Sequence, residues 1–116
     1  MVQLPGKLTI TESIMTAYNA VRFKVKPGME KAFEDAHREA GRDFPGFDGG
    51  ALVKTGDRSY CFIGKWKSFD ALTAARPQMI GTLDKFRGML EDLGGSLGVT
   101  DPVSGEAVVE IPASKA

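Results

Sequence analysis

The segment that decides the fold runs from Val25 to Leu72 and reads VKPGMEKAFEDAHREAGRDFPGFDGGALVKTGDRSYCFIGKWKSFDAL. Pro27-Gly28 ends the extended run before it, because proline lacks a backbone donor and glycine favours a turn. The residues that follow are rich in Ala, Glu, Lys and Arg and end at Gly41. Four apolar residues recur among them at helical spacing: Met29, Phe33, Ala36 and Ala40. This pattern predicts a helix directly after a strand.

A strand hairpin is predicted after that helix. Phe44-Pro45-Gly46-Phe47 has the Pro-Gly pair of a turn, and Thr55-Gly56-Asp57 reverses the chain between two predicted strands, Gly50–Lys54 and Ser59–Trp66. The second strand is apolar on both faces, with Tyr60, Phe62 and Trp66 on one side and Cys61 and Ile63 on the other. We therefore expect both of its faces to be buried.

A further strand is predicted upstream, at Tyr18–Lys26, because apolar and polar residues alternate there. One face carries Asn19, Val21, Phe23 and Val25. The opposite face is partly polar and includes Arg22, which we expect either to reach a dimer seam or to pair with an acid.

Downstream, Ser68 is a favourable N-cap for a helix that begins at Phe69, and Pro77 is expected to divide this helix into two pieces. The second piece is predicted from apolar residues at helical spacing: Met79, Leu83, Phe86, Leu90 and Leu93. A glycine-rich loop, Gly94–Gly105, then leads to a closing strand at Glu106–Ile111.

The resulting order, βαββαβ, predicts an α+β ferredoxin-like sandwich, with a four-stranded antiparallel sheet and both helices on one face. Its other face then bears either Cys61 and Ile63 or Tyr60, Phe62 and Trp66. Either set would expose an apolar patch to water, so a second layer is expected. A second copy of the chain supplies it most simply, which predicts a homodimer.

The length of 116 residues fits one domain, which we place at residues 17–112 between an N-terminal arm, 1–16, and a tail, 113–116. Fifteen basic and fifteen acidic residues cancel, so a nucleic-acid partner is not expected. No apolar run approaches the ~20 residues of a membrane span, and no signal peptide is recognised. We therefore expect a cytoplasmic protein in which the single cysteine, Cys61, is a small buried apolar residue.

Three motifs follow one another along the chain: Val25-Lys26-Pro27-Gly28 with Glu30 and Phe33 behind it, Phe44-Pro45-Gly46-Phe47, and the run from Trp66 to Leu72. Their order resembles the antibiotic biosynthesis monooxygenase-like family. The resemblance implies a dimeric α+β barrel with a pocket between each sheet and its helices. It also implies oxygen chemistry without a metal or organic cofactor, in which the substrate itself supplies the electrons.

Many members of that family carry a histidine on the helix after the strand-ending tryptophan, but the segment from Ala71 to Phe86 has none. This absence argues against the haem-degrading branch, which uses such a histidine as an axial ligand. The one histidine of the chain, His37, lies instead on the first predicted helix, four residues after Phe33. We expect it at the border of the apolar stripe, facing either the pocket or water.

Other side chains are candidates for the site by their type and position. Asn19 is an amide on a core-facing strand side, so it must bond to backbone groups of the arm or to a ligand. Trp66 and Tyr60 form an aromatic wall, which suits a planar ligand and an ordinary core equally. Arg76 lies at the predicted break between helical pieces, where it either binds a carboxylate or phenolate or is a solvated helix end.

Several chemistries are not indicated. There is no usable Ser/His/Asp spacing, no His/Cys cluster for a metal and no distinct acidic pair. The glycines at 94–98 follow a helix, so they predict a connector in place of a phosphate cradle.

Two functions remain open: a cofactor-independent monooxygenase of a small electron-rich aromatic or quinol-like compound, and a non-catalytic barrel that binds a small hydrophobic ligand or none. The predicted catalytic residues are Asn19, Trp66, His37 and Arg76, and the predicted ligand-binding residues are Tyr60, Phe62 and Phe86.

Overall fold

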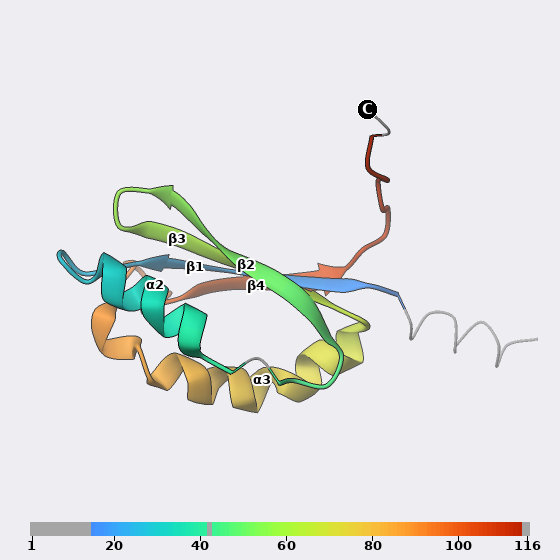
Figure 1. Cartoon of the computed structure of the whole chain (residues 1–116), viewed down its shortest axis with the longest axis horizontal. Helices are drawn as coiled ribbons and strands as arrows, with labels where there is room; N and C mark the ends of the chain where they lie inside the picture. Colours follow the sequence, from blue (N-terminus) through green and yellow to red (C-terminus); the bar gives the residue numbers. More distant parts are fainter. Residues whose placement is uncertain (1–14, 42, 115–116) are drawn as a thin grey trace, which may run out of the picture.

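A computed structural model describes residues 15–41 and 43–114, in which four strands and two α-helices follow in the predicted order (Figure 1). The strands are β1 (Ala17–Lys24), β2 (Phe47–Gly56), β3 (Ser59–Trp66) and β4 (Asp101–Glu106). The helices are α2 (Glu30–Glu39) and α3 (Phe69–Asp84), followed by one 3-10 turn, η1 (Arg87–Met89). The sheet is antiparallel with the order β2-β3-β1-β4. The predicted ferredoxin-like fold is confirmed.

Both helices lie on one side of the sheet, below it in the view of Figure 1. Ser68 begins α3 as predicted, because its hydroxyl oxygen accepts a hydrogen bond from the Ala71 amide at 3.0 Å. The Pro45-Gly46 turn leads directly into β2, with Gly46 in the left-handed region at φ +82°. The predicted N-terminal arm lies almost entirely outside the described residues.

The core between sheet and helices consists of two clusters. The first, called here the aromatic cluster, contains Phe23, Val25, Phe33, Tyr60, Phe86 and Leu90. The second, called the tryptophan cluster, contains Ala17, Trp66, Leu72 and Ala75. The helices therefore cover the face of β3 that bears Tyr60 and Trp66, which settles the alternative left open by the sequence pattern.

The prediction that Pro77 divides the second helix is wrong, because α3 runs through it without a break. Pro77 is exposed, so the carbonyl group one turn before it, which loses its helical donor, faces water and costs little. The predicted continuation to Leu93 is also wrong. The helix ends at Asp84, and Leu90 instead forms an isolated antiparallel β-bridge with Val25.

The closing strand is β4, at Asp101–Glu106, and the predicted strand at Glu106–Ile111 is wrong. β4 contains Pro102, which an edge strand tolerates because one of its sides has no ladder to complete. The alternating residues after it stay exposed: Val108, Val109 and Ile111 are 84%, 75% and 88% accessible. Figure 1 shows this tail leaving the domain on the side away from the helices.

The other face of the sheet, called here the bare face, is covered by no helix among the described residues of one chain. One cross-strand row on it consists of Ala51, Ile63, Ala20 and Val103. The prediction that both faces of β3 are buried is therefore wrong for one subunit, since Ile63 is 41% exposed and Cys61 is only half-buried. Arg22 lies on this face and forms an ion pair with Asp101 at 3.3 Å. Of its two predicted roles, pairing with an acid is therefore the one that the structure has.

Candidate functional site

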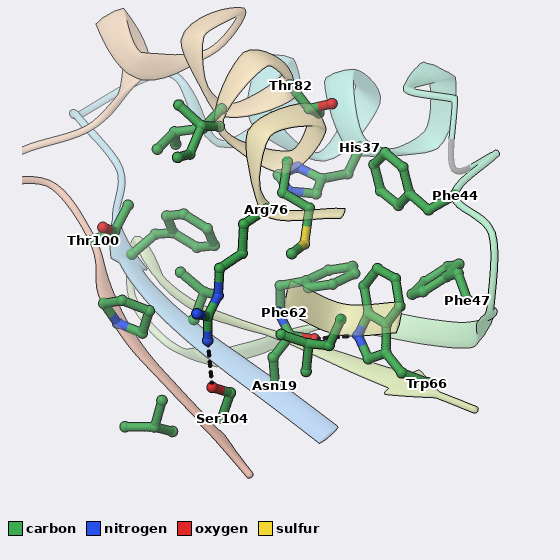
Figure 2. Close-up of a pocket in the computed structure, with 18 of the residues that line it drawn as sticks. Asn19, His37, Phe44, Phe47, Phe62, Trp66, Arg76, Thr82, Thr100 and Ser104 are labelled. Atoms are coloured by element: carbon green, nitrogen blue, oxygen red, sulfur yellow. Dashed lines mark hydrogen bonds between the residues drawn. The ribbon is translucent and has the colours of Figure 1, made fainter. Parts of the chain in front are cut away.

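A cavity of about 400 Å³ lies between the helix-covered face of the sheet and the two helices (Figure 2). The sheet contributes Asn19, Val21, Phe62 and Trp66, among others, and α3 contributes Arg76, Met79 and Leu83. The lining is mostly apolar and, among the described residues, includes no Asp or Glu. A cavity of this size has room for a small ligand.

Asn19 and Trp66 form a buried polar pair at the sheet side of the cavity, drawn with a dashed line in Figure 2. The Trp66 indole N–H donates to Asn19 Oδ1 at 2.8 Å, and the two residues are 0% and 7% exposed. Because this bond occupies the carbonyl oxygen, it also fixes the direction of the Asn19 amide nitrogen. That nitrogen has no partner among the described residues.

Gly64 makes the pair fit. It lies opposite Asn19 in the β1–β3 register, and a Cβ at this position would lie 2.5 Å from Asn19 Oδ1 and 3.1 Å from Trp66 Nε1. Any larger residue would therefore push the two partners apart. Sequence reasoning did not single out Gly64, although the predicted pairing of the two strands offered a signal for it.

Trp66 is held by two further rings that sequence reasoning did not assign to the site. Phe44 stacks on it at a centroid distance of 6.0 Å, and Phe47 meets it edge-on at 4.9 Å. Both come from the Phe-Pro-Gly-Phe turn. The turn therefore serves the site as well as the fold, since it fixes the plane of the indole ring.

Arg76 extends from α3 across the cavity to the edge strand β4 (Figure 2). Its Nη2 donates to the Ser104 hydroxyl oxygen at 3.1 Å, and its guanidinium lies 5.8 Å from the centroid of the Phe69 ring. Ser104 could not be found from the sequence, because the closing strand was predicted five residues too late.

His37 lines the same cavity from α2, so of its two predicted directions the pocket side is correct. Its ring lies 4.5 Å from Phe33 and 4.6 Å from Phe86 between centroids. His37 Nδ1 is 3.0 Å from the Phe33 carbonyl oxygen, which can only accept. A neutral ring that makes this bond carries its proton on Nδ1 and its lone pair on Nε2.

Tyr60 lies outside the cavity lining, although its strand neighbour Phe62 and the helix-end residue Phe86 belong to it. Its hydroxyl donates to Glu34 Oε2 at 2.6 Å, on the wall of a second, more polar cleft that His37 also borders. Burial, and then the bond to Glu34, raise the pKa of Tyr60 to about 12. Tyr60 therefore stays protonated and acts as a fixed donor to α2.

The structure thus brings Asn19, Trp66, His37 and Arg76 to one cavity and leaves Tyr60 out. Within residues 15–41 and 43–114, no three His, Cys, Asp or Glu side chains are grouped to hold a metal ion. In the same part of the chain, no helix has the length and hydrophobicity that crossing a membrane requires.

The fold is that of solved antibiotic biosynthesis monooxygenases. A protein assigned to that group from Chloroflexus aurantiacus matches with a TM-score of 0.63 and 12% identity, over 84% of this chain and 97% of its own. SnoaB, a cofactor-independent oxygenase from Streptomyces nogalater, matches with a TM-score of 0.60 and 20% identity, over 84% and 98%.

A haem-degrading protein from Mycobacterium tuberculosis has the same fold, with a TM-score of 0.55 and 21% identity over 85% of this chain and 98% of its own. No family model and no curated protein matches the sequence. At these identities the likeness concerns the fold, and at that level the resemblance found in the three sequence motifs is confirmed.

Proposed function

We propose that this protein is a cofactor-independent monooxygenase of a small, electron-rich aromatic or quinol-like compound. The observation that carries the proposal is a partly open, mostly apolar cavity in which the Asn19 amide nitrogen, fixed beside Trp66, is a donor. A flat apolar body fits such a space, and a fixed donor helps to set its orientation. The fold adds support, because one similar structure is described as a cofactor-independent oxygenase.

The reaction follows from what such a compound offers. A methylene between two aromatic rings, as in an anthrone, loses a proton and becomes an electron-rich enolate. The enolate carbon bonds to O₂, one oxygen atom stays as the new carbonyl, and the other leaves as water. The substrate supplies all four electrons, so no separate reductant is needed.

The side chains in the cavity suit these steps. The Asn19 amide nitrogen donates to the enolate oxygen, where negative charge develops. His37, which lines the cavity from α2, takes the proton from carbon. Trp66 holds Asn19 in place through its indole N–H, and the apolar lining limits the water around the enolate.

Haem chemistry is not proposed, although a haem-degrading protein shares the fold. Haem iron needs an axial ligand, which the haem-degrading branch is expected to carry on the helix after Trp66, and α3 contains no histidine. Arg76, which lines the cavity from α3, cannot ligate iron because its guanidinium stays protonated.

Oxygen uptake with a panel of anthrones, quinols and catechols tests the proposal. We expect turnover with one member, and ¹⁸O₂ should place one labelled atom in the product. Asn19→Ala should lower the rate about 10²-fold, as expected for one lost donor to a developing oxyanion. Trp66→Phe should lower it less, while Thr73→Ala, a hydroxyl change outside the cavity lining, should leave it unchanged. Equal rates in all four proteins would contradict the proposal.

A second candidate is a non-catalytic protein that binds a small hydrophobic molecule in the same cavity. The presence of a single titratable base in the lining, His37, favours this candidate. It predicts that aromatic compounds quench the fluorescence of Trp66, the one tryptophan of the chain, while no reduced compound consumes oxygen.

We also propose that the working form is a homodimer, paired through the bare sheet face. Tyr18, Val53, Ile63 and Val103 are 38%, 39%, 41% and 65% exposed on that side. The exposed tail after β4 leaves the domain on the same side, where it would contact a partner's sheet (Figure 1). Apolar surface that one chain cannot cover is the usual reason for such pairing.

Sedimentation velocity tests the dimer. Ile63→Lys places a charge in the middle of the bare face and should give monomers at micromolar concentration. Leu97→Lys changes a comparably exposed apolar residue in the loop before β4 and should leave the dimer intact. A stable wild-type monomer would contradict the dimer proposal. The cytoplasmic location stays a prediction.

A further inference from the structure

Arg76 differs from the other arginines that the structure describes. Arg22, Arg38, Arg58 and Arg87 each lie within 4.0 Å of at least one carboxylate. Within the described part of the chain, Arg76 has no carboxylate at that distance, and its polar partner is the neutral Ser104 hydroxyl. A guanidinium is always charged, so an arginine paired only with a hydroxyl keeps most of its capacity for an anion.

The surroundings of Arg76 favour a negative ligand. Among the described residues no Asp or Glu lines the cavity, so none of them neutralises the charge of the guanidinium inside it. The face of the Phe69 ring and the Ser104 hydroxyl hold the guanidinium at the side of the cavity where α3 meets β4. A cation that is held in place loses less side-chain freedom when it binds an anion.

The cavity also has a surplus of donors. The amide nitrogen of Asn19 has two N–H groups without a described partner, and Arg76 has further N–H groups beyond the one given to Ser104. Figure 2 shows the two side chains converging on the cavity from β1 and from α3. A ligand that satisfies both must bring acceptor oxygens at two separate places.

We propose that the ligand of this cavity is a flat aromatic carboxylate, whose carboxylate binds Arg76 and whose ring carbonyl or hydroxyl oxygen binds the Asn19 amide. A carboxylate matches the planar fork of a guanidinium with two parallel hydrogen bonds, which a neutral group cannot do. The inference rests on the proposed function only in placing the ligand in this cavity, and it adds the charge class of the ligand.

Binding of two probes tests this inference: anthraquinone-2-carboxylate and the neutral anthraquinone-2-carboxamide, which are matched in shape. Both are already oxidised, so binding is measured apart from turnover, by quenching of the single Trp66. Wild type should bind the carboxylate about tenfold more tightly than the carboxamide, as a charge-assisted bond predicts. Arg76→Gln should abolish this preference, and Arg76→Lys should keep part of it.

Two matched variants serve as controls. Arg87→Gln removes an arginine that pairs with Asp84 outside the cavity and should leave both affinities unchanged. Asn19→Ala should weaken both probes by a similar factor, because both carry the ring carbonyl. Circular dichroism and the melting temperature confirm that each variant is folded.

The inference is overturned if the carboxylate binds no more tightly than the carboxamide, if the preference persists in Arg76→Gln, or if neither probe binds. If Arg76 confers the preference but no reduced aromatic compound consumes oxygen, the inference about the charge of the ligand stands and the oxygenase proposal is wrong. The reverse result, oxygen uptake from neutral quinols that Arg76→Gln does not change, removes the inference and keeps the oxygenase.

Discussion

The two clusters of the core are built from different residues, and both of them border the cavity. In the aromatic cluster, Phe33 packs its ring against Phe23, Tyr60 and Phe86 at centroid distances of 5.4, 5.1 and 5.4 Å. The tryptophan cluster has one large ring, Trp66, and two of its other three members are alanines. Two of the four residues of this cluster, Trp66 and Leu72, line the cavity, whereas only two of the six residues of the aromatic cluster, Phe23 and Phe86, do so.

The two clusters are therefore expected to contribute differently to stability and to function. The aromatic cluster holds α2 and the end of α3 to the sheet through interlocking rings. In the other region, Trp66 of the tryptophan cluster bonds to the buried Asn19, a polar contact that apolar packing alone does not need. Changes in the first region should therefore lower stability, while changes in the second should affect binding more than folding.

The largest effect is expected in the aromatic cluster. Phe33→Ala removes a ring that is 0% exposed and should lower the free energy of unfolding by about 3 to 5 kcal/mol. Met79→Ala, which truncates a side chain at the cavity, should cost less than about 1.5 kcal/mol because the space beside it is already empty. Urea denaturation measures both, and similar losses would show that the two regions do not differ in packing.

A smaller effect is expected when the cavity wall is overfilled. Gly64→Ala should lower the free energy of unfolding by about 1 to 3 kcal/mol, because its Cβ would meet Asn19 Oδ1 at 2.5 Å. The emission of Trp66 should shift as its bond to Asn19 is lost. Gly81→Ala is the control, since nothing lies within 4 Å of that position on α3, and it should stabilise by about 0.5 to 1 kcal/mol. Stabilisation by both alanines would contradict the geometry of the pair.

The polar pair itself should show a measurable coupling. In a double-mutant cycle of Asn19→Ala and Trp66→Phe, we expect a coupling energy of about 1 kcal/mol, from the bond between the two side chains. Thermal or urea unfolding of the four proteins gives this value. Additive losses would mean that the bond does not form in solution.

The smallest effect concerns Tyr60 and depends on pH. Its pKa is raised to about 12 in the folded protein, chiefly by burial, so the folded state holds this proton more tightly than the unfolded state does. The resulting stability is complete below about pH 10, the ordinary pKa of tyrosine, and is lost as pH rises towards 12.

Tyr60→Phe should therefore cost about 1 kcal/mol at neutral pH, for the lost bond to Glu34, and should make stability fall less steeply above pH 10. The chain has one other tyrosine, and Tyr18→Phe is the control that keeps Tyr60. An unchanged alkaline slope in Tyr60→Phe would show that the hydroxyl is not perturbed by its site.

The sequence alone determined the order of the elements and the choice of fold. Alternation before Pro27, helical spacing up to Gly41 and the N-cap at Ser68 are local signals, and each depends on residues close together in the chain. The same signals placed Asn19 on a core-facing side, but they left open which face of the strand that ends at Trp66 the helices cover. Local rules failed at Pro77 and at the last strand, because solvent exposure and pairing with β1 outweighed them there.

Only the tertiary structure decided which side chains meet. The bond between Asn19 and Trp66 joins residues 47 positions apart, and the contact between Arg76 and Ser104 joins residues 28 apart. Both depend on strand register and on which face the helices cover, and neither of these is encoded in a local pattern. The cavity likewise has no sequence signature, because residues from different strands and helices line it only after they pack together.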